Sequence, residues 1–352
     1  MTVSDLQPPA APVPNELSVN NPVEVQRAVE NRNADLVDQI KETADKLVRD
    51  GASRGDIKIL ARTLRELRYA FKVFSQHRHR RKVTVFGSAR TPPEDPAYLQ
   101  AMDFGRAMAE RDWMVITGAA SGIMEAGHRG AGRKHSMGLN ILLPFEQEAN
   151  PIILGDDKLV HMKYFFTRKL MFVKECHAFV CLPGGFGTLD EGLEVLTLLQ
   201  TGKRDMAPVV LLDAPGHEYW SHLQSMIDVL ERKHMISPDD QSLYKITDNC
   251  QEDVDEVIGF FRVYNSVRYV KQKLVFRLNE PLHPVLLAEI NEAFADILAE
   301  GQFEQRGPLG EEKDEPDLAS LPRLVFQFNR RSLGRLRQLI DVINRGSVDP
   351  AI

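Results

Sequence analysis

The chain has 352 residues and lacks any continuous run of about 18 apolar residues, the length that a membrane-spanning helix requires. Its first 22 residues also lack the basic start and the apolar centre of a signal peptide, and the absence of arginine among them argues against a transit peptide. Because this stretch is rich in proline and polar residues, we expect a disordered tail over 1–22. These absences predict a cytoplasmic protein that does not bind membranes.

Cysteine is scarce too, and the three that occur, Cys176, Cys181 and Cys250, form no CxxC pair and no disulfide framework, which fits a reducing compartment. There is no HExxH motif and no His/Cys cluster at metal-ligand spacing, so no metal is expected. No lysine has the surroundings that mark a Schiff base with pyridoxal phosphate, so we expect no organic cofactor and no decarboxylase. The formal net charge of −6 gives no general attraction to nucleic acid.

Residues 23–80 are predicted to be helical. One helix is expected to start at Asn33 as its cap and to end at Gly51, and a second is expected to start near Asp56. The second helix carries an apolar stripe with steps of three and four: Ile57, Leu60, Leu64, Leu67, Phe71 and Phe74. The stripe predicts packing against the main domain, with a contact between subunits as the alternative.

Residues 81–262 alternate between strand and helix patterns. Strands are expected at 83–87, 113–118, 136–144, 178–185 and 207–213, and helices at 95–112, 122–134, 163–176, 188–203 and 217–233. Strands separated by helices in this rhythm indicate parallel βαβ units, and the nearly continuous apolar strands indicate a sheet covered on both faces. The fold class predicted is α/β, a Rossmann-like doubly wound parallel sheet.

Residues 263–352 change in character. The stretch "KLVFRLN" at 273–279 recurs as "RLVFQFN" at 323–329, and each copy precedes a helical pattern. An acidic stretch, "GPLGEEKDEPD", lies between them. We therefore expect a small C-terminal α+β module made of two half-repeats, with a structural or dimerising role.

Three glycine-bearing turns follow predicted strands, at 87–90, 117–127 and 183–188. Ligands of open parallel sheets bind beyond the carboxyl ends of the strands, and glycine lets the backbone approach a ligand closely. A helix that starts at such a turn directs free N–H groups at an anion. The three turns could together cradle one phosphate, although each is also compatible with an ordinary connection, and none matches a Walker motif or a complete GxGxxG.

The third turn is the most informative. Gly184, Gly185 and Gly187 can bring backbone amides to a ligand, and Thr188 adds a hydroxyl near the helix start. Asp190 and Glu191 follow in the first helical turn, where acids also suit the helix dipole. An acid directly behind an anion-binding turn would face the uncharged part of a polar ligand.

The stretch "PGGFGTLDE" resembles the PGGxGTxxE signature of the LOG family, whose members are often mislabelled as lysine decarboxylases. Three further segments keep the family's order: "TGAASGIMEAG" resembles its second glycine turn, "FFTRKLMF" its helix with an Arg-Lys pair, and "LEVLTLLQTGKRDMAPVVLLD" its segment after the signature. The resemblance covers roughly residues 83 to 262. It implies a Rossmann-like enzyme that cleaves nucleoside 5'-monophosphates into free base and ribose 5-phosphate, with water as second substrate, no organic cofactor, and a homodimer or larger assembly.

Carried over position by position, the resemblance implies Arg168 and Glu191 as catalytic residues. Expected substrate contacts are Gly87, Ser88, Thr117, Gly118, Gly122, Met124, Glu125, Phe165, Lys169, Gly184, Gly185, Gly187 and Thr188. Cleavage of an N-glycosidic bond passes through an oxocarbenium-like state, which a carboxylate such as Glu191 can stabilise while it orients or deprotonates water. Arg168 could hold the phosphate or stabilise the departing base, and Phe165 could stack on the base or pack in the core.

The sequence departs from the family pattern at Ala119 and Ala120, where many members have glycines, which could reshape the phosphate turn. The additional helices and C-terminal module resemble the longer bacterial nucleotide nucleosidases more than the cytokinin-activating enzymes. The base preference therefore stays open between ordinary purine or pyrimidine nucleotides and cytokinin ribotides. The rival hypothesis is a non-catalytic nucleotide sensor or carrier that uses the same cleft.

Overall fold

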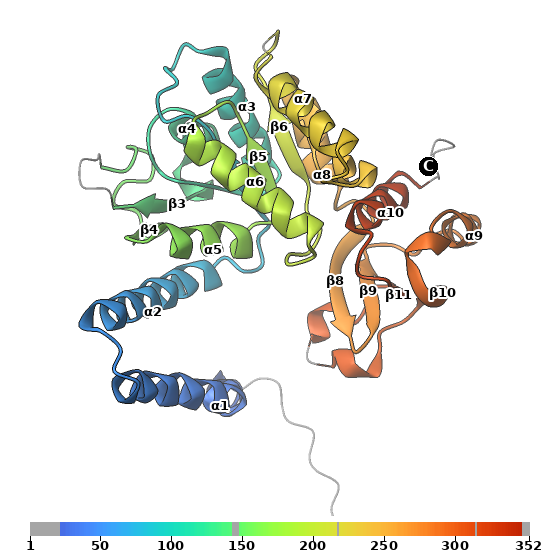
Figure 1. Cartoon of the computed structure of the whole chain (residues 1–352), viewed down its shortest axis with the longest axis horizontal. Coiled ribbons are helices and arrows are strands. Elements are labelled where there is room, and N and C mark those ends of the chain that lie inside the picture. The colour runs from blue at the N-terminus through green and yellow to red at the C-terminus, as the bar shows by residue number, and fades with distance from the viewer. Residues whose placement is uncertain (1–21, 143–147, 217, 314, 347–352) are drawn as a thin grey trace, which may run out of the picture. The chain divides into compact units, whose positions relative to one another are not determined.

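The computed structural model describes residues 22–142, 148–216, 218–313 and 315–346, with side chains from residue 33 (Figure 1). The tail predicted over 1–22 lies outside the described residues, apart from Pro22. The chain divides into two compact units, residues 1–62 and residues 63–352, which are described separately. The boundaries expected at 22, 80 and 262 stay predictions.

The first unit contains helix α1 (Pro22–Arg49) and the first residues of helix α2 (Arg54–Ser75). The expectation that a helix starts at Asn33 is wrong, because α1 already begins at Pro22 and runs through that position. The reason is local: proline suits the first position of a helix, and "VEVQRAVENR" at 23–32 contains neither glycine nor proline to interrupt one.

The second unit is organised around a parallel sheet of seven strands, and the predicted α/β doubly wound class is confirmed. The strands are β1 (Lys82–Phe86), β2 (Met114–Thr117), β3 (Ser136–Ile141), β4 (Leu159–Met162), β5 (Ala178–Cys181), β6 (Val209–Leu212) and β7 (Lys245–Thr247). Their order is β4-β3-β2-β1-β5-β6-β7, so the chain moves outward from β1 to β4 and then returns to the other side of β1. The edge strands β4 and β7 were not predicted, because the exposed His161 interrupts the apolar run of β4 and because β7 has only three residues.

Helices cover both faces of this sheet (Figure 1). They are α3 (Pro96–Glu110), α4 (Ile123–His135), α5 (Phe165–Glu175), α6 (Phe186–Gln200), α7 (Tyr219–Arg232) and α8 (Cys250–Gly259). Alternate residues of β1 and β5 point to opposite faces of the sheet. On one face, Val83 and Val180 pack with α3, α4 and α8. On the other face, Phe86 and Phe179 pack with α5 and α6. Within the described residues, no helix is long and apolar enough to cross a bilayer.

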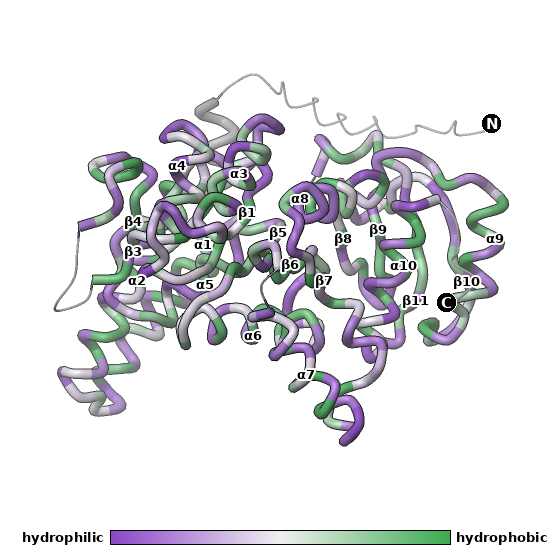
Figure 2. Tube along the Cα trace, turned by 90° about the horizontal axis from the view of Figure 1, so that it is seen from above, coloured by the Kyte–Doolittle hydropathy of each residue, from purple (hydrophilic) through white to green (hydrophobic). Residues whose placement is uncertain are grey.

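A second, antiparallel sheet follows, built from β8 (Tyr264–Val270), β9 (Lys273–Leu278), β10 (Leu298–Arg306) and β11 (Arg323–Phe328) in the order β10-β11-β9-β8. Its helices are α9 (Pro284–Ala293) and α10 (Leu333–Arg345). The two copies of the sequence repeat are the central strands β9 and β11, and each half of the module runs strand, strand, helix. Apolar and polar residues are interspersed along α10, where both green and purple segments appear in Figure 2.

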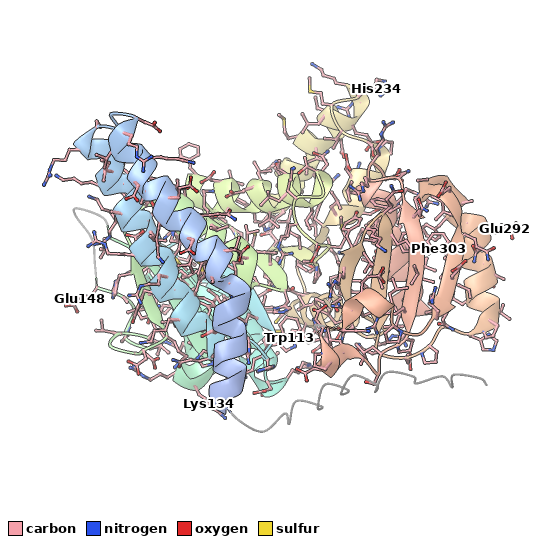
Figure 3. All side chains as sticks on the ribbon, turned by 90° about the horizontal axis from the view of Figure 1, so that it is seen from below. Trp113, Lys134, Glu148, His234, Glu292 and Phe303 are labelled. Atoms are coloured by element: carbon pink, nitrogen blue, oxygen red, sulfur yellow. The ribbon has the colours of Figure 1, made fainter. Side chains whose placement is uncertain are left out.

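The core of this module joins that of the parallel sheet. Phe303 of β10, labelled in Figure 3, is 2% exposed and packs on Phe326, with ring centroids 4.6 Å apart. These rings belong to the same apolar cluster as Trp220 of α7. The shared cluster fixes the module against the parallel sheet within the second unit.

The acidic stretch between the two repeats is bound to the second sheet by buried ion pairs. Arg277 of β9 and Arg323 of β11 are direct cross-strand partners. Glu312 lies between them, 3.2 Å from the Nε of Arg277 and 3.1 Å from the Nε of Arg323. Like charges on facing strands repel, so this carboxylate is needed to compensate the two guanidinium groups.

Candidate active site

A cavity of about 820 Å³ opens at the carboxyl ends of β1, β2, β3 and β5. The strand order reverses between β1 and β5, which is where ligands of open α/β sheets bind. Eleven of the fifteen predicted site residues line this cavity. They are Gly87, Ser88, Gly118, Met124, Phe165, Arg168, Gly184, Gly185, Gly187, Thr188 and Glu191.

The three glycine-bearing turns are joined to one another by hydrogen bonds. The backbone N–H of Ser88 in the first turn donates to the carbonyl of Pro183 in the third, at 3.1 Å. The carbonyl of Ser88 accepts from the N–H of Ile123 at 3.0 Å, and the hydroxyl of Ser121 donates to the carbonyl of Ala89 at 2.8 Å. The first turn therefore holds the second and the third in a common arrangement.

The glycines of the third turn have two different roles. A Cβ at Gly184 would lie 2.1 Å from the hydroxyl oxygen of Thr188 and 2.9 Å from the backbone nitrogen of Ser88, so close packing requires glycine there. A Cβ at Gly185 or Gly187 would meet nothing within 4 Å, so these positions border open space. The first amides of α6 have no partner within the helix and lie at the positive end of its dipole. This turn is therefore suited to an anion.

Glu191 is held in the cavity wall by α6 and is only 6% exposed. Its Oε1 lies 3.9 Å from the Nη2 of Arg168, and its Oε2 lies 3.4 Å from the Nζ of Lys169. Burial raises the pKa of the Glu191 carboxyl above its ordinary value, although Lys169 and Arg168 both act to lower it. The carboxyl is thus more basic than one exposed to water.

Arg168 reaches the cavity from α5, where aromatic rings and a neighbouring glycine define its position. Its guanidinium carbon lies 5.1 Å from the ring centre of Phe165 and 5.6 Å from that of Phe172, within the range of cation–π attraction. A Cβ at Gly118 would lie 3.6 Å from its Nη1. The arginine therefore spans the cavity from the end of β2 to the carboxylate on α6.

The start of α5 is anchored by a buried carboxylate on α2. Glu66 is 5% exposed; its Oε1 accepts the N–H of Lys163 and its Oε2 accepts the hydroxyl of Thr167, each at 2.9 Å. An acid at this end of a helix is also favoured by the helix dipole. Sequence reasoning did not identify Glu66, since the pairing joins residues about a hundred positions apart.

Four predicted site residues do not line the cavity: Thr117, Gly122, Glu125 and Lys169. Thr117 is buried at the start of the second turn, and Glu125 pairs with Arg129 at 2.6 Å. At Gly122 a Cβ would lie 2.3 Å from the carbonyl oxygen of Ser88, so the glycine allows two turns to touch.

Lys169 contacts three carboxylates of α6, those of Asp190 at 2.8 Å, Glu191 at 3.4 Å and Glu194 at 2.6 Å. Burial alone would lower the pKa of Lys169, but these carboxylates raise it above its ordinary value. Lys169 thereby offsets the negative charge of these three carboxylates.

Several cavity residues were not predicted, among them Arg90, Asn140, Ile141, Phe172, Phe186 and Leu189. Arg90 is the last residue of the predicted turn at 87–90, a position that could have identified it, whereas Asn140 lies inside the strand predicted at 136–144. Phe186, the variable residue of the PGGxGT pattern, is 92% exposed. No cluster of three or more His, Cys, Asp or Glu side chains suited to a metal occurs among the described residues.

Comparisons with known proteins match the part of the chain that contains the cavity. The family model described as "Possible lysine decarboxylase" matches residues 117–257, a range that includes the second and third turns, Arg168 and Glu191. The probable cytokinin riboside 5'-monophosphate phosphoribohydrolase LOG4 of Oryza sativa subsp. japonica is 30% identical over 179 residues, which are 49% of this chain and 74% of that protein. The cytokinin riboside 5'-monophosphate phosphoribohydrolase LOG3 of Arabidopsis thaliana is 33% identical over 165 residues, 45% of this chain and 73% of that protein.

Among solved structures, the molybdenum cofactor carrier protein of Chlamydomonas reinhardtii is similar at 18% identity and a TM-score of 0.36, over 51% of this chain and 97% of that one. This score adds nothing to the fold described above. The sequence relatives are decisive, because they share about a third of their residues with this chain over about three quarters of their own length. On that evidence, the chain belongs to the LOG family.

Proposed function

We propose that this chain hydrolyses the N-glycosidic bond of nucleoside 5'-monophosphates and releases the free base and ribose 5-phosphate. The observation that carries this proposal is the buried carboxylate of Glu191 in the cavity wall, 3.9 Å from the guanidinium of Arg168. The relatives named as phosphoribohydrolases support the same reaction. Whether the preferred base is an ordinary purine or pyrimidine or a cytokinin is measured with a panel of nucleotides.

The 5'-phosphate is assigned to the glycine-rich side of the cavity. Gly185 and Gly187 border open space at the start of α6, where amides and the helix dipole attract an anion. The hydroxyl of Thr188 adds a further donor at the same wall. The more apolar side, with Phe165 and Phe172, is suited to the flat face of a base.

The reaction places positive charge on the sugar. The bond between C1' and the base nitrogen breaks, the base leaves with the bonding electron pair, and the oxygen of water forms the new bond to C1'. The water loses one proton and the base gains one, so the protons balance. The transition state resembles an oxocarbenium ion.

Glu191 has two tasks in this scheme. Its ionised form stabilises the positive sugar, and its oxygen can accept the proton that the attacking water loses. The raised pKa of Glu191 supports the second task, because a carboxylate buried in this way is a stronger base than one in water. Arg168 keeps its charge at all relevant pH values and can stabilise the departing base or hold the ribose phosphate.

The test is product release from a panel of nucleoside 5'-monophosphates, including a cytokinin ribotide, with free base and ribose 5-phosphate measured separately by chromatography. We expect equimolar release by the wild-type chain and loss of release in Glu191→Gln. Glu194→Gln is the matched control, since Glu194 also contacts Lys169 but does not line the cavity. Binding of nucleotides without any release would instead favour a sensor or carrier.

The homodimer or larger assembly and the cytoplasmic location expected from the sequence stay predictions. Sedimentation of the purified chain measures the first, and fractionation of the source cells measures the second.

A further inference from the structure

The second glycine-bearing turn contains a residue in an unusual conformation. Ala119 is fully buried and has φ = 62°, in the left-handed region that residues with a Cβ disfavour. Its N–H donates to the hydroxyl oxygen of Thr117 at 2.9 Å. A conformation of this kind persists only where surrounding contacts enforce it, and such sites often serve a function.

The enforcing contacts come from Asn150, a residue 30 positions further along the chain and 5% exposed. Its backbone N–H donates to the carbonyl of Ala119 at 2.8 Å. Its side-chain Nδ2 donates to the carbonyl of Ala120 at 3.1 Å. Two successive carbonyls of the turn therefore point toward this one asparagine.

His128 of α4 in turn holds the amide of Asn150. It is fully buried, its Nε2 lies 2.9 Å from the carbonyl of Met137, and its Nδ1 lies 3.2 Å from the Nδ2 of Asn150. Burial lowers the pKa of His128 to about 4, so the ring is neutral and one nitrogen remains an acceptor. With Nε2–H donating to the carbonyl of Met137, Nδ1 accepts the second hydrogen of the Asn150 amide.

The orientation of the carbonyls determines where the following amides point. In a planar trans peptide, the N–H of the next residue is directed opposite to the C=O. Because the carbonyls of Ala119 and Ala120 face Asn150, the N–H groups of Ala120 and Ser121 face the other way. Ala120 lines the cavity, and within the described residues neither of these amides makes a hydrogen bond.

We propose that Asn150, supported by His128, is a positioning residue that fixes the second turn so that the amides of Ala120 and Ser121 bind an anionic oxygen of the substrate. Successive amides directed at one point form an anion-binding nest. The inference rests on the proposed function for the identity of the anion, the 5'-phosphate of a nucleotide. It also accounts for an alanine at position 119, where glycine would adopt the positive φ more easily: hydrogen bonds from Asn150 replace the freedom of glycine.

The experiment measures the binding of ribose 5-phosphate to the full chain by titration calorimetry, which requires no turnover. Asn150→Ala is expected to raise the dissociation constant about tenfold, the loss of roughly one hydrogen-bonded contact. The double variant Asn150→Ala with Ala119→Gly is expected to regain wild-type affinity to within about threefold, because glycine adopts the left-handed conformation without support. The recovery is the result that a merely structural role would not produce.

Asn344→Ala is the matched control. Like Asn150, Asn344 is buried and bonded to backbone groups. It accepts from the N–H groups of Val263 and Tyr264 and donates to the carbonyl of Phe260. It lies in the C-terminal module and does not line the cavity. It should lower the melting temperature without changing the affinity for ribose 5-phosphate. If Asn150→Ala does not fold, Thr117→Val removes the acceptor of the Ala119 N–H and takes its place in the same cycle with Ala119→Gly.

Three results would overturn the inference. They are unchanged affinity in a folded Asn150→Ala, lost affinity that Ala119→Gly does not restore, and no binding of ribose 5-phosphate or inorganic phosphate by the wild-type chain. The proposed function fails separately, if the wild-type chain binds ribose 5-phosphate but releases no base from any nucleotide.

Discussion

Replacing Glu191 by glutamine tests the catalytic assignment most directly. Glutamine keeps the shape of the side chain and removes its charge. For the positive sugar we take the distance that separates Glu191 from Arg168 in the same cavity, 3.9 Å. At an effective dielectric constant of about 20, a carboxylate at that distance from a developing positive charge contributes about 4 kcal/mol, equivalent to about a thousandfold in rate. We therefore expect kcat to fall by about three orders of magnitude while the affinity for nucleotide stays nearly constant.

The same variant has a predicted effect on stability. At the same dielectric constant, the Glu191 carboxylate is attracted to Lys169 at 3.4 Å by about 5 kcal/mol and to Arg168 at 3.9 Å by about 4 kcal/mol. Each buried ion, however, also loses several kcal/mol of hydration. The raised pKa of Glu191 gives the sign of the balance. The folded state binds its proton more tightly than the unfolded state, so this carboxyl stabilises the fold below its ordinary pKa. That contribution is lost as the pH rises through the raised pKa.

The ionised Glu191 thus stabilises the fold less than the neutral carboxyl does, and at neutral pH Glu191→Gln should unfold at the same temperature as the wild-type chain or at a higher one. Calorimetry measures this temperature, and steady-state kinetics measures kcat and KM for the same preparations. The raised pKa also predicts that wild-type activity declines on the acid side at a pH above the ordinary pKa of a glutamate.

The reasoning is refuted if Glu191→Gln keeps more than about a tenth of the wild-type kcat, since the Coulomb estimate requires a much larger loss. It is also refuted if Glu194→Gln loses as much activity as Glu191→Gln, because Glu194 contacts the same lysine without lining the cavity. A marked fall in melting temperature for Glu191→Gln at neutral pH would contradict the sign derived from the pKa.

Three further predictions follow from packing around the site and in the C-terminal module. Gly184→Ala should lower the melting temperature, because its Cβ would meet the Thr188 hydroxyl at 2.1 Å. Gly185→Ala, whose Cβ would meet nothing within 4 Å, should keep the melting temperature and weaken the binding of ribose 5-phosphate. Equal melting temperatures for the two variants would contradict this prediction. Glu312→Gln leaves two buried arginines undercompensated and should cost about 3–5 kcal/mol in urea unfolding, and an unchanged midpoint would count against a structural role for the pair. Asn140 lines the cavity, and its side-chain amide makes no hydrogen bond within the described residues. Asn140→Ala should therefore reduce discrimination among bases by about tenfold, while inhibition by ribose 5-phosphate stays unchanged. Equal discrimination would show that Asn140 does not recognise the base.

Most of what the sequence by itself determined is local. The apolar runs at β1, β2, β3, β5 and β6 and the helical periodicity between them were sufficient for the α/β class, because each signal lies within one contiguous segment. The glycine pattern at 183–188 predicted a turn at the end of β5 that is suited to an anion, and it identified the family. The repeat of "KLVFRLN" and "RLVFQFN" predicted an α+β module of two half-repeats, and the repeated stretches are neighbouring strands of one sheet.

Tertiary structure alone decided what depends on contacts between distant segments. The short strands β4 and β7 are stable only because a longer neighbour pairs with each of them. The support of α5 by Glu66 and of Ala119 by Asn150 joins residues about a hundred and about thirty positions apart, and no local pattern records either pairing. Thr117 and Lys169 were predicted as substrate contacts from their place in motifs, and in the folded chain neither of them lines the cavity. A motif specifies which residues come close to a site, whereas the side chains that reach the ligand are set by how the surrounding strands and helices pack.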